Sequence, residues 1–262
     1  MGPAGRFAEL VQRAEESIAL DEAALLVAAA ADSRVDVNLW LAVLDDLASR
    51  CDDRSLTGVV QHLAREGFRG DRSEYYDPRN SYLNHVLERR RGIPITLSIA
   101  TIEVGRRLGV PIVGIGMPGH FVVRDGHDGD AFADPFNGVL LDRAGCARLL
   151  SVVQPDVAFD DSFLAPVGPR AIVTRLLANL KGIHTARRDR AALISVLQLR
   201  LAIPGVPLQE RRELASALAA DGRFLEAASA LDELAALARD RGFGPLVEEA
   251  EQGAIRLRAR LN

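Results

Sequence analysis

Apolar residues recur at helical spacing through most of the first ninety positions of the chain. Between residues 21 and 50 they fall on stripes three and four residues apart, and a further amphipathic segment covers residues 55–68. Asp21 is expected to cap the first of these helices, and Asn80 or Ser81 to cap a helix that begins near Tyr82. The pattern therefore predicts a helical N-terminal part.

The pattern changes from helix to strand in the middle of the chain. Residues 94–108 are expected to form a longer helix, because Pro94 suits the first turn, where its missing N–H has no consequence, and Gly109 ends the apolar run. Three short strands follow at residues 111–116, 120–124 and 131–135. The glycine- and aspartate-rich segment "DGHDGD" predicts a hairpin between the last two strands.

From residue 166 onward the pattern is helical again, with five amphipathic segments separated by short Gly, Pro and Asp breaks. Two of them, "RDRAALISVLQLRL" and "GRFLEAASALDELA", recur at an offset of about 35 residues, close to the period of tetratricopeptide helix pairs. The segment "AFDDSFLAPVGPR" is rich in Pro, Asp and Gly, as domain linkers are. We therefore predict two domains, residues 1–165 and residues 166–262.

Composition narrows the class of protein. The 262 residues carry a formal net charge of −4, which argues against general nucleic-acid binding because such proteins present a basic surface. No apolar run approaches the roughly 18 residues of a membrane span, and the N-terminus lacks a signal-peptide core. The two cysteines, Cys51 and Cys146, form no CxxC pair, so neither a zinc site nor a disulfide framework is indicated. A cytoplasmic, reduced protein without metal, cofactor or membrane partner is expected.

His120 and Asp134 are the candidate chemical groups. A cysteine-type acyl-transfer site needs a thiolate at a helix N-terminus, an imidazole within hydrogen-bond reach and a carboxylate to orient that imidazole. His120 opens the second predicted strand and Asp134 closes the third, so a hairpin would bring the two side chains together. The same residues are also compatible with a histidine at a strand edge and an Asp-Pro turn that ends a strand.

Three motifs resemble the SirB-type proteins: "YYDPRNSYLNHVLERRRGIPITLS" (75–98), "GIGMPGHFVVR" (114–124) and "DPFNG" (134–138). The resemblance implies a mostly helical α+β fold, with a transglutaminase-like (cysteine-protease-like) core, a small antiparallel sheet and a tetratricopeptide-like tail. It places His120 and Asp134 at the positions of a catalytic triad. The other positions that it marks in the cleft are Asn80, Tyr82, Gly92, Gly119 and Pro135.

The nucleophile that the resemblance requires is missing. Catalytic members of the wider superfamily begin the helix with a motif like G-x-C, and with Gly92 aligned, the cysteine position falls on Pro94. Proline offers neither a nucleophile nor an N–H for an oxyanion hole. The resemblance therefore implies a non-catalytic protein that binds a peptide or protein partner in a regulatory or scaffolding role.

Two alternatives remain. A cryptic hydrolase or acyltransferase would use the hydroxyl of Thr96, Ser98 or Ser81 as nucleophile, with the His120–Asp134 pair as general base. However, helical Ser and Thr hydroxyls commonly bond to a carbonyl one turn back. Alternatively, the imidazole and carboxylate serve only structure, as a buried polar network.

Overall fold

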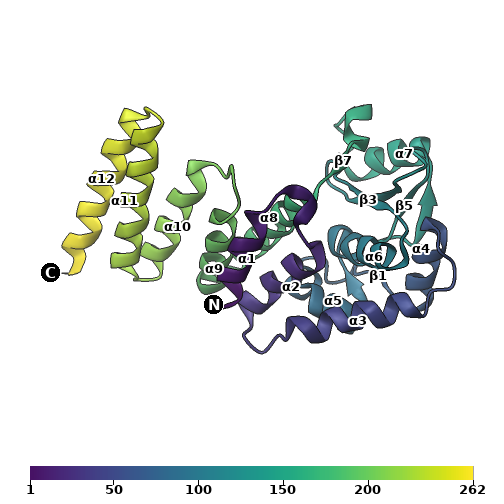
Figure 1. The fold of residues 1–262 in the computed structure, drawn as a ribbon. Coiled ribbons are helices and arrows are strands. Elements are labelled where there is room, and N and C mark those ends of the chain that lie inside the picture. The colour runs from purple at the N-terminus through teal and green to yellow at the C-terminus, as the bar shows by residue number, and fades with distance from the viewer. Residues whose placement is uncertain (262) are drawn as a thin grey trace. The chain divides into compact units, whose positions relative to one another are not determined.

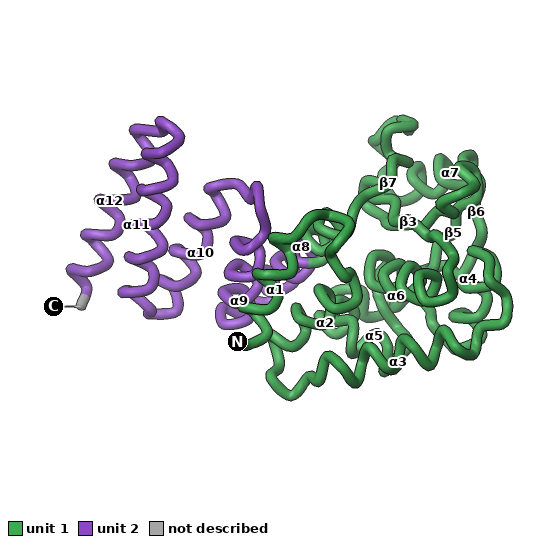
Figure 2. The backbone as a smooth tube through the Cα atoms, in the orientation of Figure 1, with its two compact units in different colours: residues 1–176 green, residues 177–262 purple. Residues whose placement is uncertain are grey.

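The computed structural model describes residues 1–261 and divides into two compact units, residues 1–176 and 177–262 (Figure 2). The division lies within helix α8 (Pro169–Arg187), further along the chain than the predicted 165/166 boundary. The Pro- and Asp-rich segment before α8 belongs to the first unit, because its strand β7 (Pro166–Val167) pairs with the sheet.

The N-terminal part of the first unit is helical, as predicted, but the predicted caps are wrong. Ala19 precedes the helix that Asp21 was expected to cap, and the Asp21 side chain instead binds arginines. Tyr82 precedes the next predicted start without a side-chain cap, while Asn80 ends a short 3₁₀ helix. The helices are α1 (Pro3–Val11), α2 (Leu20–Ala31), α3 (Val37–Ser49), α4 (Leu56–Arg65) and α5 (Leu83–Arg89).

Helix α6 (Pro94–Leu108) is the centre of the first unit (Figure 1). It packs against α2 to α5 and against two strands of the sheet, and eleven of its fifteen residues are buried. Its predicted bounds are confirmed: Pro94 occupies the first turn, and Gly109 follows at φ 73°, a left-handed conformation that favours glycine. The backbone preferences of Pro94 and Gly109 therefore set the two ends of α6.

A five-stranded antiparallel sheet packs beside α6, in the order β6-β5-β4-β3-β7. The predicted hairpin is confirmed, since β4 pairs with β5 with Val123 opposite Ala133. Helix α7 (Arg143–Val153) shares an apolar cluster with the sheet. The longer strands are β3 (Ile112–Ile115), β4 (Val122–Asp125), β5 (Phe132–Asp134) and β6 (Val139–Leu141); β1 (Arg69–Gly70) and β2 (Arg91–Gly92) form a separate parallel pair. The predicted α+β class is confirmed.

Two buried carboxyls meet where α2 packs against α6. Asp21 and Glu103 are each 2% exposed, and both accept hydrogen bonds from Arg106 and Arg107 at 2.7–3.1 Å. Burial and the neighbouring Asp21 raise the pKa of Glu103 to about 7. Burial acts to raise the pKa of Asp21, but hydrogen bonds from Arg107, Glu103 and the Glu22 backbone together lower it. Glu103 therefore holds a proton in the folded protein under conditions where the unfolded chain has lost it.

This difference predicts a pH dependence of stability. Between pH 4.5 and about 7, only the folded chain keeps the Glu103 proton, so this group makes unfolding easier as pH rises through that window. Glu103→Gln removes this titrating group. The free energy of unfolding of the variant, relative to that of wild type, should rise by on the order of 1–3 kcal/mol between pH 5.5 and pH 8 in urea titrations. Glu66→Gln is the matched control. Arg50 lowers the pKa of Glu66, so the contribution of Glu66 to stability is already complete at pH 5.5. The free energy of unfolding of this variant should therefore differ from that of wild type by the same amount at both pH values.

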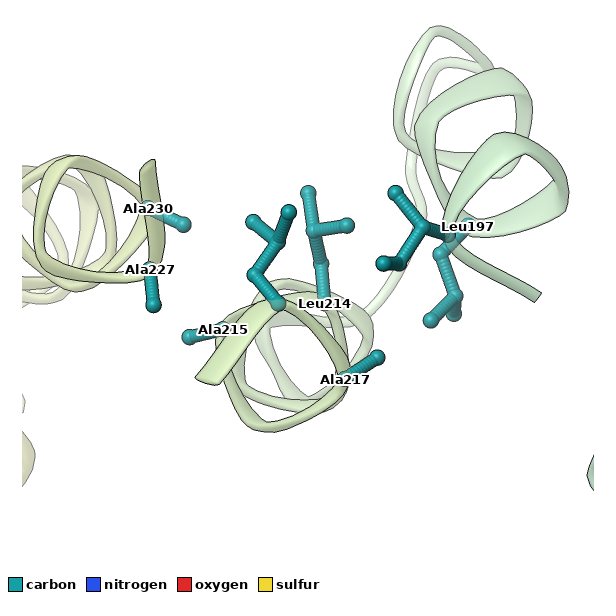
Figure 3. Close-up of a cluster of buried hydrophobic side chains, with 8 residues drawn as sticks. Leu197, Leu214, Ala215, Ala217, Ala227 and Ala230 are labelled. Carbon is teal, nitrogen blue, oxygen red and sulfur yellow. The ribbon is translucent and has the colours of Figure 1, made fainter. Parts of the chain in front are cut away.

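The second unit consists of helices, as the sequence predicts. Helices α9 to α12 pack in series, each against the next. Figure 3 shows Leu197 of α9 facing Leu214 of α10, while small alanines line the contact between α10 and α11. The helices after α8 are α9 (Arg190–Leu201), α10 (Leu208–Ala220), α11 (Phe224–Asp240) and α12 (Gly244–Arg258).

Candidate functional site

His120 and Asp134 lie in contact at one end of the sheet. The Nε2 atom of His120 is 3.0 Å from Oδ2 of Asp134, and both residues are buried. Asp134 is the last residue of β5, as expected, whereas His120 lies two residues before β4 rather than opening it. The hairpin thus brings together the two candidate residues, which are separated by fourteen positions in the chain.

Asp134 also organises the turn that follows it. Its Oδ1 accepts the backbone N–H of Phe136 at 2.9 Å and that of Asn137 at 3.3 Å, and its Oδ2 accepts the Asn137 side-chain amide at 2.5 Å. The carboxylate is therefore held in one orientation by donors on three sides. This arrangement both directs the imidazole and stabilises the "DPFNG" turn.

The second ring nitrogen of His120 is available. Nδ1 makes no hydrogen bond within residues 1–261, and this atom is not fully buried. An imidazole that donates its Nε2–H to a carboxylate carries a lone pair on Nδ1. This pair has the arrangement of a general base whose nucleophile would stand beside Nδ1.

The backbone around His120 is fixed by a distant arginine. The Arg175 guanidinium donates to the carbonyl oxygens of Met117 (2.8 Å) and His120 (2.7 Å), and it lies 5.5 Å from the centre of the Phe121 ring. Burial lowers the pKa of Arg175. Gly119 adopts φ 70°, and a Cβ there would lie 2.7 Å from the Gln154 amide. Sequence reasoning missed Arg175, which comes from α8.

A series of aromatic side chains begins at the His120 imidazole. The Phe136 ring meets His120 edge-on at 6.0 Å between ring centres, and Tyr75 meets Phe136 at 6.1 Å. Tyr76 follows at 5.2 Å from Tyr75 and is 73% exposed. Two of the sequence motifs therefore converge on His120, and the aromatics lead from the buried ring to the surface.

Pro94 occupies the first position of α6 and is buried. Two residues on, the Thr96 hydroxyl accepts the Ile93 N–H at 3.1 Å and donates to the Asn80 carbonyl at 2.7 Å. A Cβ at Gly92 would lie 2.7 Å from the same hydroxyl. Thr96 therefore ties the start of α6 to the "DPRN" turn.

The other residues predicted for the site are buried or half-buried. Ser81 and Ser98 are fully buried, and their hydroxyls have no hydrogen-bond partner within residues 1–261. The Asn80 amide donates to the Glu74 carbonyl at 2.7 Å. Tyr82 is half-buried and Pro135 is buried. No hydrogen bond in the described chain joins Thr96, Ser98 or Ser81 to His120.

Neither cysteine has the lowered pKa of a reactive thiol. Cys146 is buried in α7, where burial and the carboxylates Asp142 and Asp134 raise its pKa to about 11. Burial also raises the pKa of Cys51, whose thiol donates to the Asp53 carbonyl. Across residues 1–261 no three His, Cys, Asp or Glu side chains gather to hold a metal ion, and every helix is too short or too polar to cross a bilayer.

Comparison with known families fits this geometry. Residues 8–178, which include α6, the sheet and Arg175, match the family model of the transglutaminase-like superfamily. The chain belongs to the transglutaminase-like superfamily. Within that superfamily it is similar to bacterial proteins named UPF0162.

Two of the bacterial relatives cover most of this transglutaminase-like chain. A UPF0162 protein of Xylella fastidiosa strain Temecula1 is 38% identical over 213 residues, covering 74% of this chain and 75% of the relative. A UPF0162 protein of Pseudomonas aeruginosa is 32% identical, covering 71% and 72%. F-box only protein 21 of Mus musculus is 34% identical over 119 residues, which cover 43% of this chain and 19% of that protein. No solved structure matches.

Proposed function

We propose that this transglutaminase-like chain is a non-catalytic protein that binds a peptide or protein partner, in a regulatory or scaffolding role, at the surface beside His120. The observation that carries the proposal is Pro94 at the first position of α6, while the His120–Asp134 pair is intact at 3.0 Å. An oriented imidazole with an unpartnered Nδ1 still recognises a donor, even where no nucleophile stands beside it.

The surroundings of His120 support binding. Phe136, Tyr75 and Tyr76 lead outward from the imidazole, and Tyr76 is largely exposed. Aromatic residues are enriched at binding surfaces because they contribute large contact areas at a low cost in side-chain entropy. The Arg175 guanidinium keeps the backbone at Met117 and His120 in place.

A hydrolase or acyltransferase that uses a hydroxyl receives less support. The Thr96 hydroxyl is engaged by two backbone groups, and Ser98 and Ser81 are 0% exposed. A nucleophile must reach both the general base and the substrate, and a fully buried hydroxyl reaches no substrate.

We also assign the chain to the SirB-type proteins, and its tail to the tetratricopeptide-like arrays. The three motifs support the first assignment. The second is supported by the spacing of α9 and α11, which begin at Arg190 and Phe224, about 34 residues apart. Stacked helix pairs of this kind present extended binding surfaces.

Restoring a thiol tests the assignment of Pro94. The proposal puts position 94 beside the His120 imidazole, so the thiol of Pro94→Cys should have a depressed pKa and react with iodoacetamide at pH 6 at least about tenfold faster than in Pro94→Cys/His120→Ala. Cys51 and Cys146, whose pKa values are raised, should contribute little background. Equal rates in the two variants would remove Pro94 from the nucleophile position.

Partner binding is tested by placing a photo-crosslinking amino acid at Tyr76 in cells that make the protein. A discrete crosslinked product is expected from Tyr76, and none from Leu39 of α3, which is 58% exposed and serves as the control. Mass spectrometry then identifies the partner. Identical products from both positions, or none from Tyr76, would count against binding beside His120.

A further inference from the structure

The second unit carries two adjoining pockets along α10. One, of about 430 Å³, is lined by the end of α8 and by α9 and α10; the other, of about 330 Å³, is lined by α10, α11 and α12. Arg212 and Ser216 line both pockets, so together the two form one continuous surface, called here the α10 groove.

The floor of the α10 groove is apolar. Leu193 and Leu197 line the first pocket, and Leu231, Leu234 and Leu246 line the second. Neither pocket is lined by a Phe, Tyr or Trp ring. Aliphatic side chains of a partner fit such pockets, whereas nucleic-acid bases, which bind by stacking on aromatic faces, find none here.

The rim of the groove is strongly basic. Its charged lining comprises five arginines and two glutamates: Arg188, Arg190, Arg212, Arg256, Arg260, Glu213 and Glu249. Both glutamates are already neutralised, Glu213 by Lys181 and Glu249 by Arg212. In contrast, Arg188, Arg190 and Arg256 are exposed and have no carboxylate partner within residues 1–261.

This concentration of charge is local. The whole chain has a net charge of −4, and several other arginines in the second unit are paired, for example Arg239 with Glu251 and Arg258 with Asp232. The unpaired arginines around the apolar floor can therefore bind carboxylates of another molecule.

We propose that the α10 groove binds an acidic segment of a partner protein, whose aliphatic side chains enter the two pockets while its Asp or Glu carboxylates meet Arg188, Arg190 and Arg256. This inference rests on the proposed function, since it names the chemistry of a partner that the chain binds. It adds a second contact region, in the second unit, to the surface beside His120.

The test uses the full chain and a phage library of random 16-residue peptides. Enriched peptides are expected to combine an excess of Asp and Glu with Leu, Ile or Val. Fluorescence anisotropy with a labelled enriched peptide should show an affinity at least about tenfold weaker for Arg190→Gln/Arg256→Gln, which removes one charge from each pocket, and a further loss in high salt. The control Arg69→Gln/Arg241→Gln removes two exposed, unpaired arginines outside the groove and should stay within about twofold of wild type.

The outcomes separate the alternatives. Enriched peptides without acidic excess, equal affinity for wild type and the groove variant, or no enrichment at all would overturn the inference. So would a labelled single-stranded 20-mer DNA that binds the groove as tightly as the peptide. If crosslinking from Tyr76 succeeds while the groove test fails, only this inference is lost; the reverse pattern removes the surface beside His120 and leaves the groove.

Discussion

Replacing Asp134 with alanine is expected to lower the free energy of unfolding by roughly 3–5 kcal/mol, because a buried acceptor with several donors is lost. The substitution strips His120 of its partner and leaves the backbone N–H groups of Phe136 and Asn137 without an acceptor. Urea titrations followed by circular dichroism and by the fluorescence of Trp40, which lies in the same unit, measure the loss.

Asp134→Asn separates the two roles of this carboxylate. The amide keeps one oxygen as acceptor for the turn and should lose only about 1–2 kcal/mol, since a hydrogen bond to a neutral acceptor replaces one to a charged acceptor. If Asp134→Ala costs less than about 1 kcal/mol, the pair has no structural role, and the buried-network alternative is discarded.

Glu210→Ala is expected to have the next largest effect, a loss of about 3 kcal/mol in the second unit. Glu210 receives two hydrogen bonds from the buried Arg200, at 2.6 and 3.0 Å, and one from Lys181 at 3.2 Å. Burial acts to raise the pKa of Glu210, but these cations lower it overall. Removal of the carboxylate leaves the Arg200 charge in a largely apolar setting without this counter-ion.

A double substitution provides the control. Arg200→Met/Glu210→Met removes both charges and keeps most of the side-chain volume, so it should recover most of the stability lost in Glu210→Ala. Thermal and urea unfolding followed by circular dichroism compare the three proteins. A double variant as unstable as Glu210→Ala would show that packing, rather than the ion pair, sets the cost.

The fold was predictable wherever local residues determine it. Pro94 and Gly109 bound the central helix by their own backbone preferences, so its limits are confirmed. The Gly/Asp turn likewise predicts the β4–β5 hairpin. Strands β6 and β7 were not predicted, because they are short and mostly exposed, whereas the equally short β5 is fully buried and follows a clear turn signal.

The same distinction applies to the site. The contact between His120 and Asp134 was predictable, because the Gly/Asp turn joins the strands that flank these two residues. Arg175 was missed, because its bonds to the His120 loop span more than fifty positions and leave no local pattern. The predicted cap Asp21 failed for the same reason, since its arginine partners lie in α6.

Pro94 also has a thermodynamic consequence that is independent of chemistry. Its ring restricts the unfolded chain to conformations close to those of a helix start, and such a restriction typically adds about 0.4–1 kcal/mol where the native backbone accepts it. Helices α2 to α5 and strands β1 to β4 pack on α6, so a stiffer first turn benefits all of them. Replacing Pro94 with a residue of ordinary backbone freedom should therefore lower the melting temperature of the protein.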